Sequence, residues 1–203
     1  MINQLPGWRQ DYAMNVAETA STLAELIVVD ATVNEAQDRA TKINLLDQKI
    51  TNAIDMFMNI HARYLFEHRF YEMRQQGLLT PDDLKGIMLS AQKEAYADAL
   101  TDNDPLFWAD KQHFFFDDVP FYNFPYTFGY LFSMGIYAKA QSVPHFEADY
   151  IALLQDTANM STEELAQKHL GVDLTQPAFW QAAADSIAKD VALFLELTGT
   201  DLD

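Results

Sequence analysis

One uninterrupted stretch, from Thr41 to Gln76, constrains the fold more than any other part of the sequence. Apolar residues recur there at alternating spacings of three and four, which is the period of one face of an α-helix. They are Ile43, Leu46, Ile50, Ala53, Phe57, Ile60 and Tyr64. Gly77 then provides a stop signal. The pattern predicts a very long helix whose apolar face must be covered by neighbouring helices.

The rest of the chain has helical signals as well. Further helices are expected over residues 13–35, 80–100, 124–140, 146–158, 161–170 and 176–197. Thr80 precedes Pro81, and Ser161 stands three residues before Glu164, so both threonine and serine are expected to cap the helices that follow. No segment shows strand-like alternation, and no internal boundary stands out. The sequence predicts an all-α protein of about seven helices in a single helical domain over residues 1–203.

Charge and composition exclude several classes of function. Lys and Arg total 13 against 30 Asp and Glu, a formal charge of -17, so the basic surface that nucleic acids or anionic membranes require is missing. There is no cysteine, so any metal must be held by His, Asp or Glu. Residues 119–138 are uncharged, but their prolines, glycines and tyrosines favour a buried helix over a membrane span. No secretory signal is visible from Met1 to Trp8, so a cytoplasmic location is expected.

Two carboxylates are aligned on the first expected helix. Asn15, Glu18, Thr22 and Glu25 follow one another at spacings of three, four and three, which places them on one narrow stripe. The stripe has two interpretations. The four residues either form the solvated side of the helix, or they include a buried carboxylate whose partner is a metal ion or another cation.

The helix expected over residues 124–140 separates two kinds of aromatic residue. Tyr122, Tyr126 and Tyr130 recur every four residues, and Phe124, Phe128 and Phe132 recur every four on the other side. Phenols directed into a polar cleft would serve as hydrogen-bond donors, whereas the same stripes also occur in ordinary cores. Both interpretations stay open at this point.

Complete catalytic motifs are absent from these residues. There is no GxxxxGK[ST], GxGxxG, GxSxG or HExxH sequence. A di-iron bundle would need Glu-x-x-His pairs, and none occurs. The residue pattern alone therefore names no reaction.

An ordered series of sequence blocks carries a resemblance to a known family. Residues 17–22 read AETAST, and later blocks read FEHRFYE (66–72), AQKEAY (91–96), FWA (107–109), FYNFPYTFGYLFS (121–133) and GVDL (171–174). In this order the blocks resemble the oligoendopeptidase F-like, or thimet-oligopeptidase-like, zinc metallopeptidases. The resemblance covers nearly the whole chain and implies the C-terminal helical part of a zincin-type oligopeptidase fold.

The resemblance implies zinc as cofactor. In this family the two histidines of HExxH and a glutamate on a following helix hold the metal, and the HExxH glutamate activates the attacking water. Glu18 stands at the position of the glutamate ligand. Glu25 is a candidate for a residue that contacts the metal ligands without binding the metal itself. Metal binding by Glu18 is thus an implication of the resemblance.

The resemblance also implies roles for residues of the peptide cleft. His113, Tyr126 and Tyr130 match positions that stabilise the oxyanion, and Tyr122, Tyr126 and Tyr130 match positions that bind substrate. Phe115 departs from the family, where a tyrosine is common. The expected substrate is a short peptide.

The HExxH motif that family members carry ahead of the glutamate helix does not occur in the 203 residues. Because a single carboxylate binds zinc weakly, the chain alone is expected to be inactive and not to retain zinc. It is expected to be either cut from a longer enzyme or encoded as a truncated remnant. The alternative is a non-enzymatic helical module that binds a peptide, a partner protein or a second copy through the uncovered cleft face.

Overall fold

The computed structural model describes residues 5–200, in which all regular structure is helical. The predicted all-α fold class is confirmed. Within that range α2 (Arg39–Ile54) continues through the π-helical segment η4 (Asp55–Asn59) into α3 (Ile60–Arg74). The long helix predicted over residues 41–76 is therefore one continuous helical run, and counting it as one helix gives the expected number.

The described residues form two compact units. The first comprises residues 5–51 and 128–200, and the second comprises residues 52–127. The single domain expected over residues 1–203 stays a prediction. No helix in residues 5–200 has both the length and the apolar character needed to cross a bilayer.

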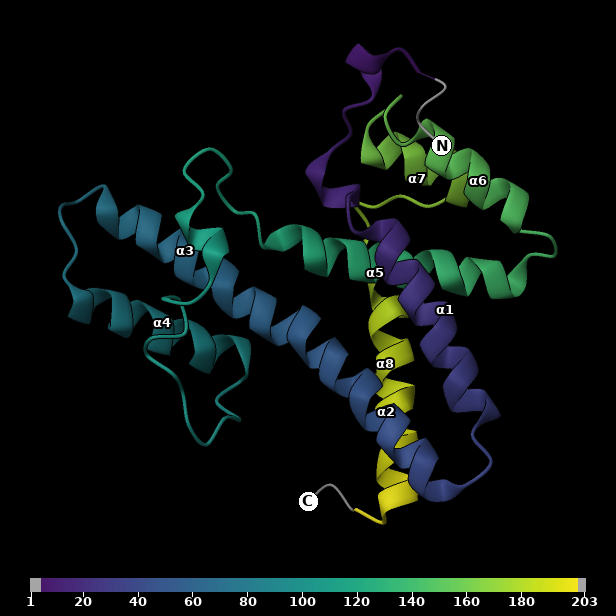
Figure 1. Cartoon of the computed structure of the whole chain (residues 1–203), viewed down its shortest axis with the longest axis horizontal. Coiled ribbons are helices and arrows are strands. Elements are labelled where there is room, and N and C mark those ends of the chain that lie inside the picture. Colours follow the sequence, from purple (N-terminus) through teal and green to yellow (C-terminus); the bar gives the residue numbers. More distant parts are fainter. Residues whose placement is uncertain (1–4, 201–203) are drawn as a thin grey trace. The chain divides into compact units, whose positions relative to one another are not determined.

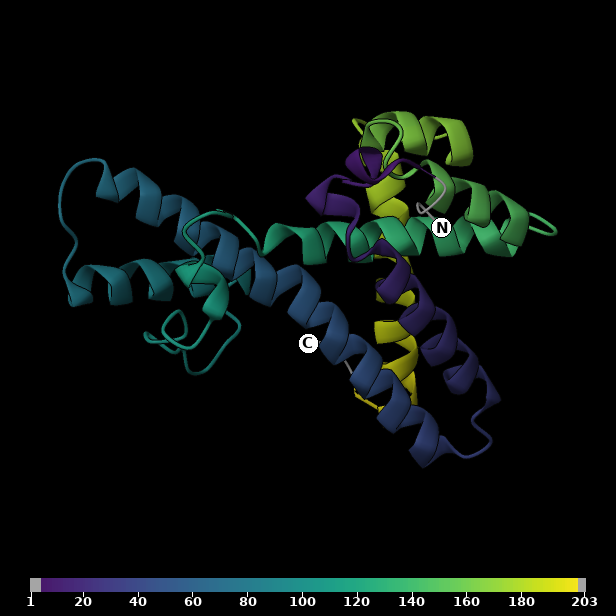
Figure 2. The same cartoon turned by 45° about the horizontal axis from the view of Figure 1, so that its top comes forward.

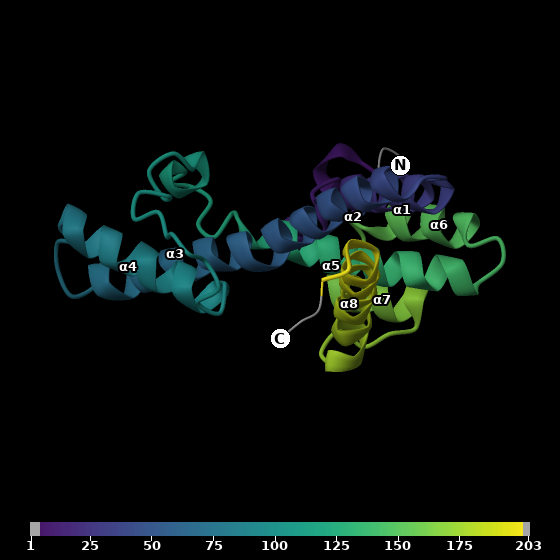
Figure 3. The same ribbon diagram turned by 90° about the horizontal axis from the view of Figure 1, so that it is seen from below.

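In the first unit, α5 (Phe124–Ser142) is the central helix from Phe128 onward. Figure 3 shows this part of α5 between a layer that contains α1 (Thr19–Glu35) with α2 and a layer that contains α8 (Pro177–Thr198). The helices α6 (Glu147–Asp156) and α7 (Thr162–Leu170) lie side by side next to it (Figure 1). The buried core residues of this unit come from α1, α5, α6 and α7 and the loop before α6: Leu23, Phe132, Ile136, Phe146, Leu153, Leu165, Ala166 and Leu170.

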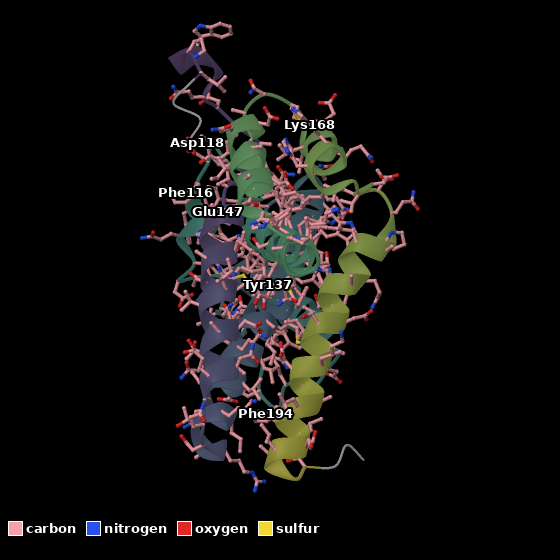
Figure 4. The ribbon with its side chains drawn as sticks, turned by 90° about the vertical axis from the view of Figure 1, so that its right-hand side faces the viewer. Phe116, Asp118, Tyr137, Glu147, Lys168 and Phe194 are labelled. Carbon is pink, nitrogen blue, oxygen red and sulfur yellow. The ribbon has the colours of Figure 1, made fainter. Side chains whose placement is uncertain are left out.

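A partly buried ion-pair cluster, centred on the buried Lys49, joins four helices of the first unit. Lys49 Nζ of α2 lies 2.9 Å from Asp30 Oδ1 of α1 and 2.7 Å from Asp190 Oδ2 of α8. The Tyr137 hydroxyl of α5 donates to Asp30 Oδ2 at 2.7 Å. Tyr137 is labelled in Figure 4 among the side chains that fill the space between α1 and α8. One ammonium group therefore ties helices that are far apart in sequence.

The second unit is built on α3 and α4 (Pro81–Ala95), which run side by side in Figures 1 and 2. Phe66 of α3 and Ile87, Met88 and Ala91 of α4 are buried between them. Trp108 stacks on Phe66 with ring centroids 6.2 Å apart. The segment after α4 thus closes over the apolar side of this helix pair.

The predicted helix starts at Thr80 and Ser161 are confirmed. Thr80 forms a capping box with Asp83, and Ser161 forms one with Glu164. Gly171 ends α7 in the left-handed conformation, with φ 67°. Side-chain oxygens thus accept hydrogen bonds from backbone amides that have no partner inside the helix. Because these bonds join residues close in sequence, the helix starts can be predicted from the sequence.

Two predicted helix boundaries were wrong. α1 begins at Thr19 instead of residue 13, because Met14–Val16 forms a 3₁₀ turn with bonds such as Val16 N–H to Ala13 O (3.1 Å). α4 ends at Ala95 instead of residue 100. Ala97 and Asp98 take left-handed conformations, and the Asp98 N–H returns to the Lys93 carbonyl at 2.7 Å, which closes the helix end.

Candidate functional site

Glu18 lies directly before the first residue of α1, in the first unit. Its backbone carbonyl accepts hydrogen bonds from Thr22 N (3.0 Å), Thr22 Oγ1 (2.7 Å) and Ser21 Oγ (2.9 Å). Its carboxylate Oε2 accepts a hydrogen bond from Ser21 Oγ at 3.1 Å, and the side chain is half-buried. The backbone of Glu18 is therefore held firmly, while its carboxylate remains partly open to solvent.

Gly129 of α5 permits the close approach of this segment. A β-carbon on Gly129 would lie 2.9 Å from Cβ of Glu18 and 3.2 Å from its carbonyl carbon. Packed side chains do not approach within such distances, so a larger residue would displace the start of α1. The candidate metal ligand thus sits where α5 comes nearest to α1.

Two hydroxyl groups fix the same contact. Thr22 Oγ1 lies 2.6 Å from Ser133 Oγ and 3.2 Å from the Gly129 carbonyl oxygen. Ser133 Oγ lies 2.8 Å from the Thr19 carbonyl oxygen and 2.6 Å from that of Gly129. Both hydroxyls are buried, so breaking this network would leave polar groups without water. It anchors the start of α1, and with it Glu18, on α5.

The predicted polar stripe of the first helix divides into different environments. Glu25 is exposed, as a solvated helix face requires, whereas Thr22 is buried against α5. Asn15 Oδ1 accepts a hydrogen bond from Thr162 Oγ1 at 3.2 Å. The stripe is therefore not one continuous solvated surface, and a role for Glu25 behind the ligands stays a prediction.

Tyr130 lies in the interior of the first unit, with 1% of its surface exposed. Burial and then the negative charge of Asp190 raise the pKa of its phenol to about 12. The hydroxyl therefore stays protonated at neutral pH and can donate a hydrogen bond. Its expected role in catalysis stays a prediction.

Two of the three phenylalanines on the other side of α5, Phe128 and Phe132, belong to the core of the first unit, whereas Phe124 is 37% exposed and lies in the second unit. Phe128 packs against Trp180 with ring centroids 5.3 Å apart, and Phe132 packs against Phe179 at 5.9 Å. Both partners lie on α8. From Phe128 onward this side of the helix is therefore structural, as one of the two sequence interpretations proposed.

The second unit brings three of the sequence-predicted residues together. His113, in the short helix η5 (Gln112–Phe115), has its Nε2 3.3 Å from the Tyr126 hydroxyl. The Tyr122 ring stacks on the imidazole with centroids 5.3 Å apart and an interplanar angle of 21°. Phe116, labelled in Figure 4, meets both His113 and Tyr122 edge-on. We call these four residues the His113 cluster.

Burial and then the positive charge of Arg63 lower the pKa of His113 below its usual value of 6.5. The imidazole is therefore neutral at pH 7, with one nitrogen as donor and the other as acceptor. A neutral imidazole beside a phenol can share a proton with a bound polar group. Phe115, the departure from the family pattern, is 63% exposed.

Three polar residues beside this cluster were missed by the sequence reasoning. Glu67 of α3 is buried, and its Oε1 accepts a hydrogen bond from the Phe121 N–H at 2.7 Å. Arg63, one turn earlier on α3, donates from Nη1 to Asn123 Oδ1 at 3.2 Å. The available signal was that Glu67 follows Ile60 by seven residues, which places a carboxylate on the apolar face of the long helix.

No group of three or more His, Asp or Glu side chains in residues 5–200 is arranged to hold a metal ion. In the part of the chain that the structure describes, Glu18 is therefore not a member of a three-ligand group. A zinc centre needs at least two further protein ligands in a catalytic site. The described residues do not fit a complete zinc site by themselves.

Comparison with known proteins decides the family. The profile of peptidase family M3 matches residues 3–185, which is most of the chain. The chain belongs to peptidase family M3. This confirms the family expected from the sequence blocks, and with it a metallopeptidase-like, hydrolase-type domain.

Individual relatives agree with this assignment. The chain is 24% identical over 177 residues to oligopeptidase PepF of Bacillus subtilis (strain 168), covering 85% of this chain and 26% of that protein. A putative peptidase from Chlamydophila abortus superposes with a TM-score of 0.80 at 21% identity, over 96% of this chain and 33% of the other. Oligoendopeptidase-F from Enterococcus faecium superposes with a TM-score of 0.74 at 22% identity, over 91% and 36%.

The solved structures show that the chain shares their fold. The chain spans only a quarter to somewhat over a third of the length of these relatives, with shares of 26%, 33% and 36%. The activity of a whole family member is therefore a matter for proposal.

Proposed function

We propose that this chain supplies part of the active site of a zinc-dependent peptidase that cleaves short peptides. In this proposal an HExxH segment contributes the two histidine ligands and the general base, and Glu18 contributes the third ligand. The observation that carries the proposal is the fixation of Glu18. Its backbone is clamped by Gly129, Thr22 and Ser133, while its carboxylate is left half-buried with Ser21 as a hydrogen-bond partner.

A carboxylate carried on a fixed backbone suits metal binding for a physical reason. Ordering a free side chain on binding costs conformational entropy, and a fixed backbone reduces that cost. The hydroxyl of Ser21, 3.1 Å from Glu18 Oε2, can orient one carboxylate oxygen and leave the other for a ligand.

The His113 cluster supports the second part of the proposal, stabilisation of the oxyanion that forms on a bound peptide. The Tyr126 hydroxyl and the neutral imidazole of His113 form a pair that can donate hydrogen bonds to a polarised carbonyl oxygen of a substrate. The Tyr122 ring restricts the imidazole to one orientation by stacking on it. Because the described residues do not form a complete zinc site, no catalytic step is assigned to a metal on this chain.

Peptide hydrolysis tests the proposal directly. The 203-residue chain alone should not cleave a quenched fluorogenic peptide, whereas a polypeptide in which an HExxH segment precedes it should do so. In that polypeptide Glu18→Ala should lower kcat/KM by a factor on the order of a thousand or more, because loss of a zinc ligand removes the metal. Glu35→Gln, an exposed change at the other end of α1, is the matched control. Equal activities of the two variants would refute the proposal.

A second candidate function is supported by the exposed surface of α1. Ile27 is 47% exposed and Val28 is 63% exposed, side by side on one helix. In this alternative the two side chains would be part of the surface that meets another protein. In this alternative the chain is a non-enzymatic helical module, and light scattering after gel filtration would show a dimer that Val28→Lys dissociates. A monomer at all concentrations would reject self-association.

A further inference from the structure

Phe121 has a backbone conformation that phenylalanine rarely adopts. Its φ is 59°, in the left-handed region that costs energy for any residue with a bulky side chain. The Phe121 ring packs against Tyr64 and Tyr71 of α3, with centroid distances of 5.7 Å and 5.5 Å. Something must hold the backbone at this point, because the strain alone would release it.

Glu67 provides that hold. Its Oε1 accepts the Phe121 N–H at 2.7 Å, and the side chain is 5% exposed. In this buried position a hydrogen bond to a carboxylate is stronger than one to a neutral acceptor. A second tie acts two residues later, where Arg63 Nη1 donates to Asn123 Oδ1 at 3.2 Å. Both ties start from α3, one helical turn apart.

The residue between the two ties is Tyr122. Its ring stacks on His113 with centroids 5.3 Å apart. We propose that Glu67 is a positioning residue, which holds the left-handed turn at Phe121 and thereby keeps Tyr122 stacked on His113. This inference deepens the proposed function and rests on it for the catalytic meaning of the stack.

Burying the carboxyl group of Glu67 costs free energy that a purely structural residue would not need to spend. Its second oxygen, Oε2, is buried and has no hydrogen-bond partner among the described residues. Burial raises the pKa of the carboxyl group, and the Phe121 N–H offsets only part of that effect. An apolar side chain at this position would fill the same space without that penalty. Such a side chain would lose the hydrogen bond that Glu67 accepts from the Phe121 N–H.

The stack can be measured in the 203-residue chain without any peptidase activity. NMR would record the cross-peaks between the Tyr122 ring and the His113 imidazole, together with the pKa of His113. Glu67→Met should lose the cross-peaks, and the His113 pKa should rise because the imidazole gains solvent. Glu67→Gln should keep both, because its amide oxygen can still accept the Phe121 N–H. Glu72→Gln, exposed on the same helix, is the control.

Glu67→Asp is a second test variant, for the case that the Glu67→Met chain does not fold. It keeps the charge but is one methylene too short to reach the Phe121 N–H in place, so the cross-peaks should weaken. The double variant Glu67→Met with Phe121→Asn should regain them, because asparagine takes the left-handed conformation more readily than phenylalanine. A folded Glu67→Met or Glu67→Asp chain that keeps the full stack would overturn the inference.

Activity separates this inference from the proposed function. In a polypeptide that also carries HExxH, Glu67→Met should lower kcat on the order of a hundredfold with little change in KM, and Glu67→Gln should retain it. If the stack is lost in Glu67→Met and kcat is unchanged, the positioning role stands and the catalytic role of the His113 cluster fails. If the stack persists, the positioning role itself is wrong.

Discussion

Gly129 and Glu18 pack so closely that a single added carbon would not fit between them. A β-carbon on Gly129 would lie 2.9 Å from the Glu18 β-carbon. The two residues are far apart in sequence and come from different helices, α5 and the start of α1. The position of the candidate metal ligand therefore depends on the absence of a side chain on its neighbour.

This contact predicts that Gly129→Ala destabilises the chain. The added methyl group forces the start of α1 away from α5, and overpacking of this kind costs about 1–3 kcal/mol. Gly86→Ala in the interior of α4 is the matched control, because nothing lies within 4 Å of its added carbon. That change should instead stabilise the chain by about 0.5–1 kcal/mol. Urea unfolding measures both, and a Gly129→Ala chain as stable as the wild type would contradict the packing described.

The partly buried ion-pair cluster predicts a large effect of Lys49→Met. The change would leave Asp30 and Asp190 without their shared cation, at a cost of about 3 kcal/mol in the free energy of unfolding. Lys85→Met is the control, because its pair with Asp82 is exposed and contributes less than about 1 kcal/mol. Equal losses in the two variants, measured by urea unfolding near pH 7, would show that the cluster adds no stability.

The same cluster predicts a pH dependence. Burial opposes the charged form of Asp30, but hydrogen bonds from Lys49 and Tyr137 outweigh it and lower the pKa below 3.8. The stability that Asp30 contributes is therefore present above pH 3.8 and is lost as the pH falls through the lower pKa of the folded state. The difference in unfolding free energy between the wild type and Asp30→Asn should shrink only below that pH. If the difference between the two chains disappeared near pH 6, the pH dependence would belong to a group other than Asp30.

Tyr130 predicts a loss of stability in alkaline solution. Its pKa is about 12 in the folded chain against 10.0 for an ordinary phenol, so between these values the folded state keeps a proton that the unfolded state has lost. Stability should fall across this range by about 2 kcal/mol more in the wild type than in Tyr130→Phe. Unfolding curves at pH 9.5 and 11.5 measure the difference. Parallel losses in both chains would mean that the Tyr130 phenol is not buried as described.

The helix starts at Thr80 and Ser161 could be predicted from the sequence, because each depends on hydrogen bonds within four neighbouring residues. The start of α1 could not. A 3₁₀ turn at Met14–Val16 precedes it, and Gly129 and Ser133, more than a hundred residues away, hold this segment against α5. The end of α4 was missed as well, because Ala97 and Asp98 take left-handed conformations there without the glycine that normally signals a helix end.

The candidate site shows the same division. The resemblance to a known family named His113, Tyr122 and Tyr126, and the structure brings these three together. Glu67 was missed, because nothing in its sequence neighbourhood shows that its partner is the backbone of Phe121. A buried carboxylate becomes recognisable only when the turn that it holds is in place.

The zinc content of the polypeptide that carries this chain together with an HExxH segment tests the central claim most directly. Metal analysis of purified protein should find one zinc atom per polypeptide in the wild type and in Glu35→Gln. Glu18→Gln, which keeps the size of the side chain but removes its charge, should lose most of that zinc. Full zinc occupancy in Glu18→Gln would contradict the claim that Glu18 is a metal ligand.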